Sequence, residues 1–204
     1  MDLKICGMRD SANILEVAKA KPQYMGFIFY QGSPRFVGDN FVMPELDPEI
    51  KKVGVFVNAP TGAILEITAR YALNLVQLHG DESVEQCEEL KNHNVLVIKA
   101  FPMDEKVEFQ DINGYHAAVD FFLFDTKGKY FGGNAKRFDW RVLARYNQQT
   151  PFFLSGGLAP ENIAEAKALR DMNIVALDVN SGVEIRAGVK DIDKVKQVVS
   201  LIRD

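Results

Sequence analysis

The sequence is poor in the residues that build disulfide frameworks and metal centres. Its 204 residues include two cysteines and three histidines. Two cysteines are too few for a disulfide framework, and neither has the spacing of a metal-ligand set. The composition therefore predicts a protein without disulfides or a metal site, and we expect it in a reducing compartment, the cytoplasm.

Long apolar runs and an excess of basic residues are also absent. No apolar stretch reaches the length of a membrane-spanning helix, and the first residues, Met1–Lys4, do not form a signal peptide. The net charge is −4, with no basic cluster, which argues against nucleic acid as a partner. With 47% hydrophobic and 25% charged residues, the composition is that of a globular protein with a sizeable core.

Apolar strand-like runs alternate with helix-like stretches along the whole chain. The runs lack a clean polar alternation, as expected for parallel strands that are covered on both faces. The predicted strands are 3–6, 24–29, 52–57, 73–78, 95–100, 121–124, 151–154 and 174–178. The predicted helices are 11–19, 59–71, 82–92, 139–145, 160–170 and 190–203. Eight strands with intervening helices predict an α/β fold, a single-domain (β/α)8 (TIM) barrel over residues 1–204.

Two connections of this barrel do not carry a helix pattern. Pro44 and Pro48 would interrupt a helix between residues 38 and 50. The segment between residues 102 and 119 has only a weak helical pattern. We therefore expect an irregular second connection and a weak fifth helix.

A thiol and a carboxyl group end two of the predicted strands. Cys6 ends the first strand and precedes Gly7, and Asp125 follows the run 121–124. In a parallel β/α barrel, the C-terminal ends of all strands open on the face that holds the active site. These two side chains are therefore expected to meet over one pocket, where they could act as a base and an acid.

Glycine-bearing loops follow the seventh and eighth strands. The first contains Gly156 and Gly157 and leads to a helix near Pro160; the second contains Asn180, Ser181 and Gly182. In such barrels these two loops often bind phosphate through backbone N–H groups. Each loop alone is equally compatible with a simple tight turn, but the pair in these positions favours a phosphate site.

One arginine stands where it could recognise a carboxylate. Arg35 follows the second strand in Gly32-Ser33-Pro34-Arg35 and would lie over the barrel mouth. A guanidinium group can bind a carboxylate through two parallel hydrogen bonds. The alternative is a solvated surface arginine.

Eight motifs in order resemble those of the phosphoribosylanthranilate isomerase family, and together they span nearly the whole chain. They are Lys4–Met8, Gly26–Phe29 with Ser33–Arg35, Val53–Asn58, Gln77–Gly80, Phe124–Thr126, Gly132–Gly133 with Phe138–Trp140, Leu154–Leu158, and Asp178–Val179 with Ser181–Glu184.

The resemblance implies an Amadori rearrangement in tryptophan biosynthesis that needs no metal, nucleotide or redox cofactor. N-(5-phosphoribosyl)anthranilate becomes 1-(2-carboxyphenylamino)-1-deoxyribulose 5-phosphate. Asp125 would be the general acid and Cys6 the general base. Arg35 would bind the anthranilate carboxylate.

The resemblance also assigns the phosphate site and the partners. Gly156, Gly157, Ser181 and Gly182 would bind the phosphate, with Asn180 standing where serine is common, and Asp178 would line the site in a supporting role. The substrate is a small phosphosugar–anthranilate molecule, and the chain is expected to be a monomer or a homodimer.

The proposed chemistry makes a demand on the thiol. As a base, Cys6 must give up its proton, so its pKa is expected to fall from about 8.5 toward neutrality. In the sixth loop, Asn134 and Ala135 stand where the family usually has a small hydroxyl residue and glycine, which should stiffen that loop.

Other barrels that bind phosphosugars are the main alternatives. An indole-glycerol-phosphate synthase would need a catalytic lysine and glutamate, and the isomerase of histidine biosynthesis typically has an aspartate at the Cys6 position. A phosphate-binding barrel without catalytic activity is a third alternative, which Cys6 and Asp125 disfavour.

Overall fold

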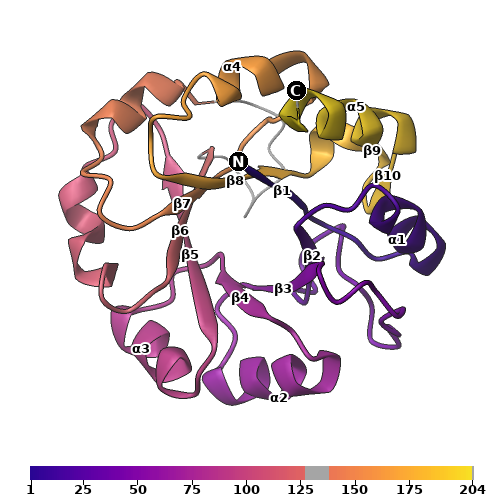
Figure 1. The fold of residues 1–204 in the computed structure, drawn as a ribbon. Helices are drawn as coiled ribbons and strands as arrows, with labels where there is room; N and C mark the ends of the chain where they lie inside the picture. Colours follow the sequence, from indigo (N-terminus) through magenta and orange to yellow (C-terminus); the bar gives the residue numbers. More distant parts are fainter. Residues whose placement is uncertain (127–137, 204) are drawn as a thin grey trace.

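A closed barrel of parallel strands forms the centre of the computed structural model, which describes residues 1–126 and 138–203 (Figure 1). The barrel strands are β1 (Asp2–Ile5), β2 (Tyr24–Ile28), β3 (Lys51–Phe56), β4 (Leu75–Leu78), β5 (Leu96–Met103), β6 (Phe121–Thr126), β7 (Phe152–Leu154) and β8 (Ile174–Val179). The α-helices are α1 (Ser11–Ala18), α2 (Thr61–Tyr71), α3 (Val84–Asn92), α4 (Ile163–Lys167) and α5 (Ile192–Arg203). Short 3-10 helices are η1 (Phe109–Tyr115), η2 (Trp140–Arg145), η3 (Pro160–Asn162) and η4 (Ser181–Val183).

Each strand pairs in parallel with the next strand in the sequence, and β1 closes the barrel by pairing with β8. This closure aligns Lys4 with Asp178 and Ile5 with Val179. The helices lie around the outside of the ring (Figure 1). The predicted (β/α)8 barrel is therefore confirmed.

The two connections without a helix pattern are irregular, as predicted. Residues 29–50 contain no helix, and the connection after β5 contains only the 3-10 helix η1. Two other predictions were too regular. The helix expected at 139–145 is the 3-10 helix η2, and the helix expected at 160–170 is divided into η3 and the short α4.

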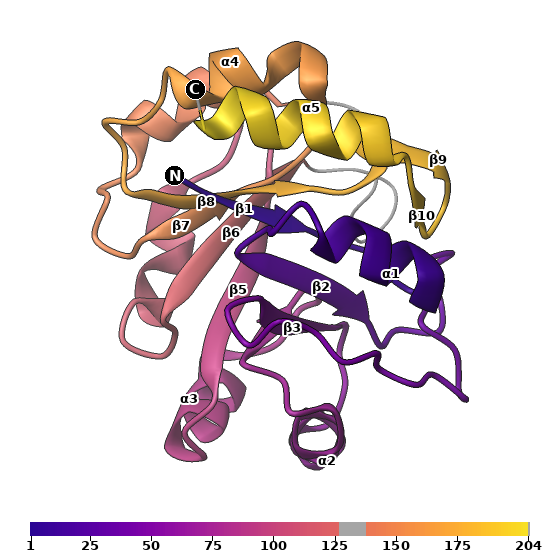
Figure 2. The same ribbon diagram turned by 45° about the vertical axis from the view of Figure 1, so that its right-hand side comes forward.

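Local capping explains where two of the helices begin. The Asp10 carboxylate accepts a hydrogen bond from the N–H of Asn13 at 2.8 Å and caps α1. The Ser83 hydroxyl accepts one from the N–H of Gln86 at 3.3 Å and caps α3. Such caps satisfy N–H groups that have no partner inside the helix. Helix α5 lies on the outside of the barrel next to α1 and α4 (Figure 2).

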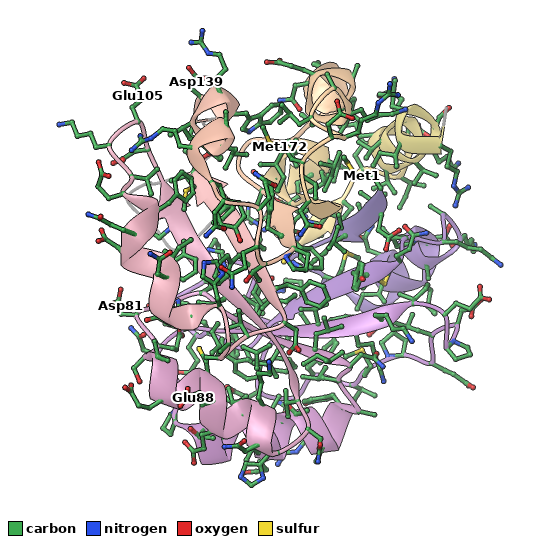
Figure 3. The ribbon with its side chains drawn as sticks, turned by 60° about the vertical axis from the view of Figure 1, so that its left-hand side comes forward. Met1, Asp81, Glu88, Glu105, Asp139 and Met172 are labelled. Atoms are coloured by element: carbon green, nitrogen blue, oxygen red, sulfur yellow. The ribbon has the colours of Figure 1, made fainter. Side chains whose placement is uncertain are left out.

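Apolar side chains form one layer inside the barrel and another between the strands and the outer helices. Side chains alternate between the two faces along each strand. The inner layer consists of Val53, Leu75, Ile98, Ala100, Leu123, Phe153 and Ala176. The outer layer includes the other face of the same strands, such as Phe122, Phe124 and Phe152. The exposed Glu88 and Glu105, by contrast, lie on the outside of the molecule (Figure 3).

A short hairpin lies outside the barrel pattern. The strands β9 (Glu184–Arg186) and β10 (Val189–Lys190) form it after β8 as an antiparallel pair, which the sequence analysis did not predict.

Among the described residues, no helix is long and apolar enough to cross a membrane.

An aromatic cluster beneath η2 should carry much of the stability of the β6–β7 side. Phe152 is fully buried, and its ring centroid lies 4.8 Å from that of Phe124. Replacing a buried phenylalanine by alanine leaves a cavity and typically costs about 3–5 kcal/mol. We expect Phe152→Ala to lower the free energy of unfolding by that amount in a urea titration. Leu15→Ala, at a position 45% exposed on α1, is the control, and equal losses in both variants would contradict the prediction.

Candidate active site

The polar residues of the site stand two positions beyond the inner apolar layer. Because side chains alternate along a strand, a residue two places after an inward apolar residue also points into the barrel. The pairs are Leu75 with Gln77, Leu123 with Asp125, and Ala176 with Asp178. Each polar partner lies nearer the C-terminal end of its strand, where the pocket opens.

A cavity of about 690 Å³, counting its open mouth, lies at this end of the barrel. Its lining includes Cys6, Arg35, Gln77, His79, Asp125, Ser155, Gly156, Gly157, Asp178, Asn180 and Ser181. All the predicted site residues except Gly182 therefore line one cavity.

Cys6 lies just beyond β1, and its side chain packs against β2. A methyl group on Gly26 would stand 2.6 Å from the Cys6 Sγ atom, so only glycine leaves room for the thiol there. Burial raises the pKa of Cys6, although the charges of Lys4 and Lys190 act against this. The expected fall of this pKa toward neutrality is therefore wrong for the unliganded protein, because the loss of hydration outweighs the neighbouring cations.

A buried ion pair lies next to the thiol. Lys4 Nζ donates to Asp178 Oδ2 at 2.8 Å, and the two side chains are 0% and 4% exposed. The pairing follows from the closure of the barrel, which aligns these two residues on β1 and β8. Burial raises the pKa of Asp178 despite the opposing charge of Lys4, and Asp125 raises it further. The charge on Asp178 also acts on Cys6, so this carboxyl group lies within electrostatic reach of both the predicted base and the predicted acid.

Asp125 is buried at the end of β6 and has two neighbours. Its Oδ1 atom accepts a hydrogen bond from the N–H of Thr126 at 2.8 Å. Its Oδ2 atom lies 3.3 Å from Nε2 of His79 on the neighbouring side of the pocket. The carboxyl group is thus fixed in orientation while it still lines the cavity.

The loop after β7 has a backbone that requires glycine. Gly156 and Gly157 have φ angles of +93° and +68°, which side chains disfavour. A methyl group on Gly156 would stand 2.2 Å from Thr126 Oγ1. The Asn162 amide also binds this loop, donating to the Gly157 carbonyl oxygen at 2.9 Å.

The loop after β8 packs against the first loop. A methyl group on Gly182 would stand 2.0 Å from the carbonyl oxygen of Leu158, so Gly182 brings the loops together from behind the cavity wall. Among acceptors in the described residues, none pairs with the N–H groups of Gly156, Gly157 or Ser181. These groups are therefore available to an anion in the cavity.

Arg35 is held by a carboxylate that the sequence analysis did not assign. Its Nε and Nη2 atoms donate to Glu184, with distances of 2.9 Å to Oε1 and 2.7 Å to Oε2. A guanidinium group presents five N–H donors, so this pairing leaves the Nη1 side for a ligand. Arg35 is therefore not a solvated surface arginine, and Glu184 occupies part of the guanidinium group that a substrate could otherwise bind.

Lys190 connects the same glutamate with the loop after β8. Its fully buried Nζ atom lies 2.8 Å from Glu184 Oε1 and 2.8 Å from Asn180 Oδ1. Gly7 lies between Arg35 and Asn180, because a methyl group on Gly7 would stand 2.7 Å from both Arg35 Cδ and Asn180 Oδ1. Glu184 therefore ties the predicted carboxylate-binding residue to the predicted phosphate loop.

The sequence analysis did not assign Lys4, His79, Glu184 or Lys190 to the site. The signal for Lys4 was a charged residue inside an otherwise apolar strand. Lys190 and Glu184 had no such signal, because the hairpin that brings them together was not predicted. The loop positions Asn134 and Ala135 lie outside the described residues. Within the described residues, no cluster of three or more His, Cys, Asp or Glu side chains could hold a metal ion.

Glu184 should make stability depend on pH in the acidic range. Burial alone would raise its pKa, but the hydrogen bond from Arg35 and the charge of Lys190 outweigh burial and bring the pKa below its ordinary 4.5. A lowered carboxyl pKa stabilises the fold above the unfolded value, and this contribution is lost as the pH falls through the folded value. Glu184→Gln should therefore cost about 3 kcal/mol at pH 7 and much less well below pH 4.5.

Urea titrations of the wild type and of Glu184→Gln across this pH range measure the difference. The control is Glu66→Gln, which removes an exposed pair with Arg70 on α2 and should cost at most about 1 kcal/mol. A difference for Glu184→Gln that is the same at pH 7 and at acidic pH would contradict the assignment.

Comparison with known proteins gives one consistent family. Residues 3–201 match the family described as N-(5'phosphoribosyl)anthranilate (PRA) isomerase. The chain is 44% identical to the N-(5'-phosphoribosyl)anthranilate isomerase of Parabacteroides distasonis over 208 residues, covering 99% of this chain and 93% of the relative.

Two solved structures agree with this match. The phosphoribosyl anthranilate isomerase of Thermotoga maritima superposes with a TM-score of 0.85 at 32% identity, covering 100% of this chain and 98% of that one. A phosphoribosyl anthranilate isomerase in complex with reduced 1-(o-carboxyphenylamino)-1-deoxyribulose 5-phosphate has a TM-score of 0.83, with the same identity and coverage. The chain therefore belongs to the phosphoribosylanthranilate isomerase family.

Proposed function

We propose that Cys6 and Asp125 carry out the reaction of this family, the isomerisation of N-(5'-phosphoribosyl)anthranilate in tryptophan biosynthesis, as base and acid. The observation that carries this assignment is that a thiol from β1 and a carboxyl group from β6 line one cavity. The same cavity offers an arginine and two glycine-bearing loops to the two anionic ends of such a substrate.

The two ends of the substrate require different partners. The phosphate is a dianion that backbone N–H groups near Gly156, Gly157 and Ser181 can bind without any charged side chain. The anthranilate carboxylate is planar and suits the remaining side of the Arg35 guanidinium. Binding at both ends would place the ribose between them, over Cys6 and Asp125.

The acid step opens the ribose ring. Asp125 gives its proton to the ring oxygen, the C1–O bond breaks with its electrons moving to oxygen, and the lone pair of the amine nitrogen forms an iminium at C1. The amine nitrogen thus serves as the electron sink, a role that a cofactor would otherwise have. Asp125 is left as a carboxylate, with the Thr126 N–H on Oδ1.

The base step follows at C2. Cys6 removes the C2 proton, the electrons move toward the iminium nitrogen, and the resulting enolamine tautomerises to the ketone. Because its pKa is raised, Cys6 first gives its thiol proton to water in the cavity, and the positive charge of the iminium favours the resulting thiolate, which then takes the C2 proton. A thiolate with a high pKa is also the stronger base.

The other predictions made from the sequence are also part of this proposal. Residues 1–204 act as one catalytic domain in the cytoplasm, as a monomer or a homodimer, on a small-molecule substrate. Arg35, Asp178 and Asn180 contact or support the substrate, and Gly182 acts from behind the loop.

Turnover by the purified protein tests the function directly. The wild type should convert N-(5'-phosphoribosyl)anthranilate, followed by the fall in fluorescence of the anthranilate group. Asp125→Asn keeps the shape of the side chain but has no proton to donate, and should lose about 10²–10⁴-fold in kcat. Asp193→Asn, at an exposed carboxyl group on α5, should be unchanged. An active Asp125→Asn variant would remove Asp125 from the mechanism.

The two cysteines provide a matched pair for the base. Cys6 lines the cavity, whereas Cys87 is a buried residue of α3, and burial raises the pKa of Cys87 to about 11. Cys6→Ala should lose at least about 10²-fold in kcat, and Cys87→Ala should keep near wild-type turnover.

Alkylation should distinguish the same two thiols. Iodoacetamide should label Cys6 first, at a rate that still rises with pH beyond 9 because its pKa is raised. The reduced product analogue should protect Cys6. Full activity in Cys6→Ala, or faster labelling of Cys87, would count against Cys6 as the base.

A further inference from the structure

The mechanism above does not use His79, which lies beside the acid. His79 follows β4, and its Nε2 atom is 3.3 Å from Asp125 Oδ2. The two side chains are 14% and 10% exposed, so water screens them little.

Gln77 determines which nitrogen of the His79 ring carries a proton. It stands two residues earlier on the same inward face, is 1% exposed, and has its amide Nε2 2.7 Å from His79 Nδ1. An amide nitrogen only donates hydrogen bonds, so Nδ1 must accept one. The ring proton then lies on Nε2, the atom that faces Asp125.

The Nε2–H tautomer of the ring satisfies the contact with Gln77. An imidazolium has a proton on both nitrogens and no acceptor for the Gln77 amide. A neutral ring matters here, because an imidazolium would hold Asp125 as its ionised partner and leave it without a proton to donate.

Buried polar contacts also fix the turn that follows His79. The Glu82 carboxylate accepts hydrogen bonds from the N–H groups of Gly80 at 2.9 Å and Asn58 at 2.8 Å. Lys99 lies 3.1 Å from Glu82 and donates to the Gly80 carbonyl oxygen at 2.7 Å. These contacts hold the backbone next to His79.

The two oxygens of Asp125 then each face a donor when the group is ionised. Thr126 N–H donates to Oδ1 at 2.8 Å, and His79 Nε2 lies 3.3 Å from Oδ2. Two ionised carboxyl groups repel each other here, and Asp125 raises the pKa of Asp178. A donor at Oδ2 offsets this repulsion at the moment when Asp125 loses its proton.

We propose that His79 is a positioning residue of the acid step. Gln77 holds its ring as the neutral Nε2–H tautomer, and the ring stabilises the carboxylate that forms when Asp125 protonates the ribose ring oxygen. This inference rests on the proposed function. The O–H bond of Asp125 breaks, its electron pair stays on the carboxylate, and its proton goes to the ring oxygen. His79 keeps its own proton throughout.

Substitutions of His79 test the donor. His79→Met has no N–H group and should lose about 10–100-fold in kcat, the effect of removing a hydrogen bond to a developing charge, with KM nearly unchanged. His79→Gln offers an amide donor and should regain part of the loss. His93→Gln, at an exposed histidine on the outside of the barrel, is the matched control and should match the wild type.

Substitutions of Gln77 test the tautomer. Gln77→Glu replaces the donor by a carboxylate, which only accepts and favours an imidazolium, so Asp125 is held ionised and kcat should fall about 10-fold or more. Gln77→Met, of similar size but without a charge, should lose less. A Gln77→Glu variant as active as the wild type would overturn the proposed role of the amide.

Nitrogen NMR of labelled protein reads the ring directly, without substrate. The chain has three histidines, and the His79 signals are those missing from His79→Gln. At pH 7.5 the wild type should show a protonated Nε2 and an unprotonated Nδ1, and Gln77→Glu should show both nitrogens protonated. A proton on Nδ1 in the wild type would overturn the inference.

The outcomes separate this inference from the proposed function. If the wild type fails to turn over the substrate, the function fails, whatever the tautomer. If the wild type is active and Asp125→Asn is not, but His79→Met keeps full kcat, the function stands and the role of His79 is refuted.

Discussion

Two-residue alternation along eight closed parallel strands is the constraint on which the site depends. Because the barrel is closed, inward residues of alternate strands meet in shared layers. The lower inward layer is apolar, and the next inward layer holds Gln77, Asp125 and Asp178. A shift of one residue in any strand would turn its polar group outward into the helical layer, so the apolar core and the site are specified together.

The carboxylates at this end of the barrel repel one another, and two buried lysines offset that repulsion. Asp178 is paired with Lys4, and Glu184 is paired with Lys190 and Arg35. Removing one partner of a buried pair costs far more than the pair itself contributes. Asp125 has no lysine or arginine contact among the described residues, and its neighbours Thr126 and His79 can bind it without fixing its charge. Within the described residues, the site thus separates carboxyl groups that are paired with cationic side chains from one that is not.

The sequence predicted the barrel and eight of the residues that line the cavity, because both follow from local patterns. Apolar runs, glycine-bearing loops and residues at strand ends are visible without any long-range contact. The 3-10 helix η2 was predicted as a regular helix because its apolar spacing resembles one. The pKa of Cys6 could not be predicted, because it depends on how burial balances Lys4, Lys190 and Asp178, which lie far apart in the sequence. The pairing of Arg35 with Glu184, 149 positions apart, was invisible for the same reason.

That long-range pairing fixes the distance between two loops at the mouth of the barrel. Arg35 comes from the irregular connection after β2, which has no helix to hold it, and Asn180 comes from the loop after β8. Glu184 and Lys190 join the two through a chain of contacts of 2.7–2.9 Å, with Gly7 leaving room between them. In the proposed function, a rigid link of this kind would fix the separation between the carboxylate site and the phosphate site before the substrate binds, which lowers the ordering cost of binding. A substrate held at both ends would have its reacting carbons over Cys6 and Asp125, and the hairpin that carries Glu184 and Lys190 would then serve the chemistry although it lies outside the barrel strands.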